Sequence, residues 1–200
     1  MLYNKKHEKG LLMSDTKILT LWKGDKLDEK AAEILRASCK DVTIPLDEEG
    51  EKDIAALLEA FLARDDALGL AAPQIGLTKR IVVFRNKGFD DKDKWTKSES
   101  DCGVLVNPRI TQARGEKVIM AEGCLSCPDI QVEIERFGEI KVRGYNAQGQ
   151  KVNKRYTDFL ARIVQHELDH LEGKLIIDYD GTIYVSQKKQ RFFQCLFQNS

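Results

Sequence analysis

The stretch HELDH at residues 166–170 decides the fold, because it places two of the chain's three histidines four positions apart. It lies within residues 157–173, whose apolar residues recur at helical spacing. We expect a helix there, with Thr157 or Asp158 as its cap and Gly173 as its stop. Histidines four apart on a helix are neighbours, with about 5–6 Å between their Cβ atoms, so both can bind one metal ion.

The metal-binding face of this helix is also predicted to be buried. Phe159 and Ile163 continue the stripe on which His166 and His170 lie. Two unpaired imidazoles in a core would be costly, and a shared metal removes that cost. Glu167 lies one step round the helix, where it can act on a metal-bound water as general base and acid. This combination favours a metal hydrolase over an exposed helix that carries these residues by chance.

The third metal ligand does not follow the motif directly. Ile176 stands where a longer metalloprotease pattern has its third histidine, although Asp178 and Asp180 remain candidate oxygen ligands. Cys124 is a better candidate, because the glycine and proline of EGCLSCP (122–128) hold it in a tight loop. One cysteine and two histidines, with a water in the fourth position, form a known catalytic set.

Two alternatives stay open at this point. Cys124 and Cys127 could join His166 and His170 in a closed structural site, which would make the protein a non-enzymatic metal module and leave Glu167 without a water. The histidine motif is also shared by metallo-endopeptidases, which the missing downstream ligand disfavours.

The rest of the chain predicts a single α+β domain at residues 17–200, preceded by a flexible extension at 1–16. Helices at both ends flank a region of short apolar runs separated by glycines, which is typical of an antiparallel sheet of short strands. We expect this sheet to pack around the metal-binding helix, with residues 85–101 as a surface loop. The other predicted helices are 28–38, 51–66 and 186–197, and the predicted strands are 81–84, 104–106, 117–120, 131–134, 139–145, 151–156 and 175–177.

Composition excludes several other classes of protein. The 200 residues carry 32 basic and 32 acidic side chains, so the protein has no net charge that would attract nucleic acid or an anionic membrane surface. No apolar run approaches the roughly 20 residues that span a bilayer. Five scattered cysteines argue against a disulfide framework and favour a reduced, cytoplasmic protein.

Three blocks together carry a family resemblance: GLAAPQ at 69–74, EGCLS at 122–126 and HELDH at 166–170. In order and spacing the chain resembles peptide deformylase, a metal hydrolase that removes the N-formyl group from newly made bacterial polypeptides. The resemblance implies attack of a metal-bound water on the formyl carbon of an N-formylmethionyl terminus.

The resemblance also implies a role for each matching residue. It makes Cys124, His166 and His170 the metal ligands, Glu167 the proton carrier, Gln74 and the backbone N–H of Leu125 the oxyanion donors, and Gly69, Leu70 and Gly123 the substrate-binding residues. Glu122, two residues before Cys124, is expected to orient this loop or to pair with a cation such as Arg136.

The implied cofactor is one divalent metal, with Fe²⁺ expected and Ni²⁺, Co²⁺ or Zn²⁺ as alternatives. The implied partners are nascent N-formylmethionyl peptides, with no specific nucleic acid and no membrane. The last helix, 186–197, is expected to dock on the core by its apolar face. Contact of this helix with the ribosome would also be in keeping with the family.

Overall fold

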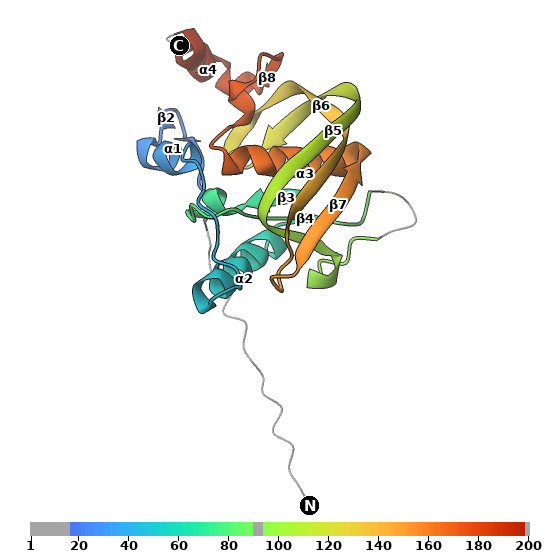
Figure 1. Ribbon diagram of the computed structural model, residues 1–200. Coiled ribbons are helices and arrows are strands. Elements are labelled where there is room, and N and C mark those ends of the chain that lie inside the picture. The colour runs from blue at the N-terminus through green and yellow to red at the C-terminus, as the bar shows by residue number, and fades with distance from the viewer. Residues whose placement is uncertain (1–16, 90–93, 199–200) are drawn as a thin grey trace, which may run out of the picture.

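Helix α3 (Asp158–Leu171) contains the HELDH motif and forms where its periodicity predicts it. It is part of a computed structural model that describes residues 17–89 and 94–198, so the expected extension at 1–16 lies outside the described residues. Thr157, in extended conformation, precedes its first turn, and Gly173 follows its last turn with a φ of +72°. Most side chains of α3 are buried, because the sheet wraps around it (Figure 1).

The main sheet is antiparallel and has the strand order β3-β4-β5-β6-β7, with β8 paired to β6. This arrangement of helices and antiparallel strands confirms the predicted α+β class. Figure 1 shows α3 across the middle of the molecule, with the curved strands β5, β6 and β7 around it. The strands are β1 (Trp22–Lys23), β2 (Lys26–Leu27), β3 (Gly69–Ala71), β4 (Ile81–Arg85), β5 (Cys102–Cys124), β6 (Cys127–Tyr145), β7 (Lys151–Thr157) and β8 (Ile183–Val185).

The expectation of short strands is wrong for the centre of the sheet. The predicted runs 104–106 and 117–120 belong to the 23-residue strand β5, and 131–134 and 139–145 belong to the 19-residue strand β6. Four register shifts interrupt the pairing of β5 with β6 without ending either strand. Bulges of this kind bend a strand and increase its twist. The glycines that indicate breaks in the sequence therefore lie in bends of one long hairpin.

The N-terminal helices are confirmed, with shifted ends. Helix α1 is Glu29–Leu35, and α2 is Glu48–Leu62 rather than 51–66. Helix α2 begins earlier because the Asp47 carboxylate accepts a hydrogen bond from the Gly50 N–H and caps the first turn. The acidic residues of that turn also stabilise the helix, because they lie at the positive end of its dipole. They carry no apolar periodicity, so the sequence pattern places the start of the helix too late.

The predicted C-terminal elements need two corrections. Residues 175–177 are not a strand, because a 3₁₀ turn (Ile176–Asp178) forms there and the Asp178 carboxylate accepts a hydrogen bond from the Leu175 N–H. The predicted helix 186–197 is divided into a 3₁₀ turn (Gln187–Lys189) and α4 (Gln190–Gln198). Strand β8, just before them, was not predicted at all.

The core has three parts that surround α3 and the end of the central hairpin. One lies between α3 and strands β4 to β7, and another lies between α2 and strands β3 to β5. The third joins α1, the tip of the β5–β6 hairpin and α4. In this third part, Phe193 of α4 is buried and packs edge-on against Trp22 with ring centroids 5.0 Å apart, so α4 docks on the core by its apolar face as expected.

Gly173 provides a test of how firmly the end of α3 is fixed. A Cβ at this position would lie 2.2 Å from the Arg36 carbonyl oxygen, in addition to the cost of a positive φ. We expect Gly173→Ala to lower the free energy of unfolding by more than the roughly 1–2 kcal/mol that a positive φ alone costs an L-residue. Gly24→Ala is the control, since Gly24 has a φ of +59° but a methyl group there would have no atom within 4 Å. Equal losses in urea unfolding would contradict this prediction.

Candidate metal centre

Three side chains converge where the β5–β6 hairpin meets α3. The Sγ of Cys124 and one ring nitrogen each of His166 and His170 lie within 4.8 Å of one another. Cys124 Sγ is 3.3 Å from His170 Nε2, and the two imidazole rings have centroids 5.2 Å apart. Cys124 is the last residue of β5, whereas both histidines project from one face of α3. The three donors could therefore share one ion.

A buried carboxylate, Glu122, fixes one of these histidines. Its Oε2 lies 3.0 Å from His166 Nδ1, which leaves the other ring nitrogen to face the centre. Arg136 Nε donates to Glu122 Oε1 at 2.7 Å and Arg136 Nη2 donates to Oε2 at 2.9 Å. Although burial alone would raise it, the hydrogen bonds with His166 and Arg136 lower the pKa of Glu122 to about 2. From the sequence, Glu122 was expected either to orient its loop or to pair with a cation such as Arg136, and in the structure it contacts both Arg136 and His166.

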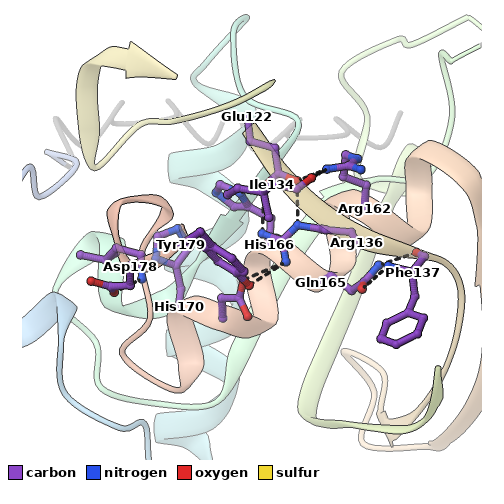
Figure 2. Close-up of polar contacts among 12 residues, drawn as sticks. Glu122, Ile134, Arg136, Phe137, Arg162, Gln165, His166, His170, Asp178 and Tyr179 are labelled. Atoms are coloured by element: carbon purple, nitrogen blue, oxygen red, sulfur yellow. Dashed lines mark hydrogen bonds and ion pairs between the residues drawn. The ribbon is translucent and has the colours of Figure 1, made fainter. Parts of the chain in front are cut away.

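The polar contacts continue from Arg136 to Asp169, three residues after His166 on α3. Arg136 Nη1 donates to Asp169 Oδ2 at 2.8 Å, and the Tyr179 hydroxyl donates to the same oxygen at 2.7 Å. Figure 2 shows Arg136 between Glu122 and Tyr179, with His166 and His170 alongside on the helix. This network holds α3 in one rotation relative to the hairpin, since its contacts reach one face of α3 at Arg162, His166 and Asp169.

Glu167 lies beside the donors without a polar partner for one of its oxygens. It is 4% exposed, and its Oε2 has no hydrogen-bond partner among the described residues. Burial raises the pKa of Glu167 to about 7. A Cβ at Gly69 would lie 2.4 Å from Glu167 Oε1, so only glycine lets β3 approach the carboxylate this closely. The structure thus holds a carboxylate in place with one oxygen available.

The donor set fits a divalent transition metal. Thiolate and imidazole ligands suit iron, cobalt, nickel and zinc. A hydrogen bond from the Cys127 thiol, together with the nearby imidazoles, keeps the pKa of Cys124 well below its usual range, which favours the thiolate, the form that binds metals.

Cys127 and the downstream aspartates are not part of the converging group. Cys127 is buried in the apolar cluster that includes Trp22, and it is absent from the three donors found among the described residues. Asp178 binds Arg36 at 3.0 Å, and Asp180 is exposed. The geometry therefore favours a three-ligand centre over a closed four-ligand site.

Gln74 and Leu125 border the centre from the other side. Gln74 Oε1 accepts a hydrogen bond from the Ala71 N–H at 2.8 Å, which directs Nε2 toward Ser126 Oγ at 3.2 Å and Cys124 Sγ at 3.9 Å. Leu125 is in the two-residue turn between β5 and β6, and no described residue accepts a hydrogen bond from its N–H. The amide and the backbone N–H are both available next to Cys124.

A cavity of about 790 Å³ opens above these groups. Gly69 and Gly123 line it, but Leu70 is fully buried and does not. Ile163 is buried as expected, whereas Phe159 is 39% exposed because it lies at the cavity mouth rather than in the core.

Arg162 is the residue of this site that sequence reasoning missed. It lines the cavity, is almost fully buried and donates to Glu122 Oε1 at 2.5 Å. The signal in the sequence is an arginine four positions before His166, on a helix face that is otherwise predicted to be buried.

Comparisons with known proteins agree on one family. The family model described as "Polypeptide deformylase" matches residues 26–189. A peptide deformylase of Pseudothermotoga lettingae is 41% identical over 145 residues, which cover 72% of this chain and 76% of the relative.

Solved structures give the same result. A probable peptide deformylase from Synechococcus phage S-SSM7 matches with a TM-score of 0.66 and 35% identity, covering 82% of this chain and 99% of the phage protein. A Met-Ala-Ser-bound class I type b peptide deformylase from Acinetobacter baumannii has a TM-score of 0.64 and 30% identity, and the match covers 82% of this chain and 98% of that protein.

Proposed function

The chain belongs to the peptide deformylase family, and we propose that its converging Cys124, His166, His170 and Glu167 remove the formyl group from N-formylmethionyl termini of newly synthesised polypeptides. The observation that carries this proposal is the three-donor group beside a buried carboxylate with one unpartnered oxygen. A hydrolase needs both a metal position and a proton carrier, and the two lie side by side here.

Cys124, His166 and His170 would hold the metal. When bound, a divalent metal supplies a Lewis acid that polarises the formyl oxygen and makes a water acidic enough to act as a nucleophile. Glu122 keeps His166 in the orientation and tautomer for binding, because its Oε2 accepts the hydrogen bond from Nδ1–H.

Glu167 moves the protons of the reaction. Its Oε2 takes a proton from the attacking water as the new bond to the formyl carbon forms. The same oxygen returns that proton to the amine nitrogen as the carbon–nitrogen bond breaks, so that formate and a free N-terminus are released. Burial of Glu167 suits this work, since a raised pKa makes the carboxylate a stronger base.

Gln74 and Leu125 stabilise the charge that develops on the formyl oxygen. Gln74 Nε2 is held toward Cys124 by the Ala71 and Ser126 hydrogen bonds, so little reorganisation accompanies the reaction. The Leu125 N–H is a second donor on the same side.

Backbone at Gly69 and Gly123 receives the peptide as an added strand, because both residues line the cavity, Gly69 as the first residue of β3 and Gly123 next to the last residue of β5. Leu70, which the resemblance made a substrate residue, would contribute through its backbone alone. The Met-Ala-Ser complex of the A. baumannii relative supports a short peptide as the occupant.

One pair of assays tests the reaction. We expect formate release from formyl-Met-Ala-Ser, measured by a coupled formate dehydrogenase assay, without cleavage of internal bonds in a longer unformylated peptide. Internal cleavage without formate release would instead favour the metallo-endopeptidase, and metal binding with neither reaction would favour the structural metal module.

Glu167→Gln is expected to abolish turnover and keep one metal per chain, because Glu167 moves protons and does not bind the ion. Cys124→Ala is expected to lose metal, whereas Cys127→Ser, the matched thiol control, keeps both metal and most activity. Metal content by mass spectrometry is measured beside formate release. Loss of metal from the Glu167 variant would contradict this division, and loss from the Cys127 variant would restore the four-ligand site.

Gln74→Ala is expected to lower kcat by on the order of 10²–10³, the usual effect of removing one oxyanion donor. Ser126→Ala is the comparison variant, since it removes one contact that positions the Gln74 amide and keeps the amide itself, so a smaller loss of kcat is expected. The rate of formate release at saturating substrate measures both variants. An unchanged kcat for Gln74→Ala would remove this residue from the mechanism.

The expected metal is Fe²⁺, with Ni²⁺, Co²⁺ and Zn²⁺ as alternatives that the same donors can bind. Iron-loaded protein should lose activity in air as the metal and the Cys124 thiolate oxidise, whereas nickel-loaded protein should persist. Residual formate release and the mass of the Cys124 peptide measure this decay, with both forms kept under argon as controls. Equal lifetimes in air would argue against iron.

The proposed setting is the cytoplasm, where nascent chains are found. No helix in the described part of the chain combines the length and apolar character needed to cross a membrane. Contact with the ribosome is proposed through the polar face of α4. Phe193, on the opposite face of the helix, is already buried against Trp22, whereas Arg191 is exposed. Sedimentation of the protein with ribosomes, compared with Arg191→Glu, tests that contact.

A further inference from the structure

Arg162 is a buried cation on the cavity wall to which the mechanism above gives no task. It lies on α3 four residues before His166, and its side chain is 7% exposed. Phe159, Arg162, Ile163 and His166 all line the cavity from the same face of the helix. Above the metal-binding end of this wall, where His166 and Glu167 lie, Arg162 places one guanidinium beside the apolar side chains of Phe159 and Ile163.

Orientation of Glu122 does not explain this arginine. Arg136 already donates to both oxygens of the Glu122 carboxylate, through Nε and Nη2. The bond from Arg162 Nη1 is a third one, to an oxygen that has a donor without it. Burying a second guanidinium is costly, so a role beyond holding Glu122 is expected.

Arg162 has donors to spare. Its Nη1 donates to Glu122 Oε1 and to the Ile134 carbonyl, and its Nη2 donates to the Val118 carbonyl. These bonds use three of the five N–H groups of a guanidinium. Among the described residues, Nε and the second N–H of Nη2 have no acceptor, and Nε is not among the atoms sealed from solvent. Arg162 lines the cavity, so we infer that its spare N–H groups can be reached from there.

The first side chain of a substrate would meet this wall. With the formyl carbon beside His166 and the peptide backbone paired at Gly69 and Gly123, the face of α3 above His166 is left for that side chain. One helical turn above His166 the face presents Ile163 and Arg162 together, and Phe159 follows at the mouth. An apolar stem could lie on Ile163 and Phe159 while its end reaches the guanidinium.

On the basis of the proposed function, we propose that Arg162 determines specificity for the first residue and favours an apolar side chain that ends in a hydrogen-bond acceptor. The substrate class is N-formyl peptides that begin with methionine or, better, methionine sulfoxide. A sulfoxide oxygen is a strong acceptor, a thioether sulfur is a weak one, and norleucine has none. A purely aliphatic side chain would cover the spare N–H groups of Arg162 without accepting a hydrogen bond from them. Buried donors that are left unpaired weaken binding, so such a substrate is disfavoured.

The test compares kcat/KM for three peptides that differ only in the first side chain: formyl-Met-Ala-Ser, its methionine sulfoxide form and its norleucine form. In the wild-type protein the sulfoxide is expected to exceed norleucine. Arg162→Leu should lower the sulfoxide-to-norleucine ratio on the order of tenfold or more, chiefly through KM, and Arg162→Lys should lie between the two. The ratio is insensitive to a general loss of activity, and metal content is matched among the variants.

Tyr184→Phe is the control, because Tyr184 lines the same cavity from β8 and also carries a polar group. It should leave the ratio unchanged. A wild-type ratio below one, or a ratio that Arg162→Leu and Arg162→Lys leave within twofold of wild type, would overturn the inference while formyl-Met-Ala-Ser is still deformylated. If the wild-type protein released no formate from any of the three peptides, the proposed function itself would be wrong.

Discussion

The buried carboxylate of Glu122 is the contact on which the rest of the site depends. It joins β5 to α3 through His166 and Arg162, and to β6 through Arg136. Breaking a buried pair by removing one partner typically costs about 3–5 kcal/mol, because the other charge is left without compensation. The position of α3 relative to the hairpin is therefore fixed by a group that is not itself a metal ligand. The same contact sets the direction of the His166 ring.

The long β5–β6 hairpin makes this contact possible. Its strands carry Glu122 and Arg136 at places that face α3, and its two-residue turn places Cys124 at the end of the helix face that holds the histidines. Register shifts let the hairpin curve around α3 without losing its pairing. A flat hairpin of equal length could not contact the helix at both its tip and its middle. The curvature of the sheet thus brings the Cys124 thiol and the supporting charges of Glu122 and Arg136 to one helix.

Helix α3 and the three converging donor residues could be predicted from sequence because their signals are local or specific. The spacing of His166 and His170 is a property of one helix, and Cys124 lies in a loop whose glycine and proline are visible in the sequence. The long strands could not be predicted, since a bulge and a break look alike when only glycines such as Gly115 and Gly138 are seen. Arg162 was missed for a different reason: its partners Val118 and Ile134 come from distant strands and accept through backbone carbonyls, which leave no trace in side-chain patterns.

The charges around the centre explain why a divalent cation suits it. Arg136 and Arg162 are balanced by Glu122 and Asp169, so this supporting network is formally neutral. The groups that remain are the Cys124 thiolate and the Glu167 carboxylate, which together carry two negative charges when ionised. Burial raises the pKa of Glu167 to about 7, and its Oε2 has no hydrogen-bond partner among the described residues. A divalent ion at the three donors would balance both charges, and it would do so without disturbing the network that holds its ligands.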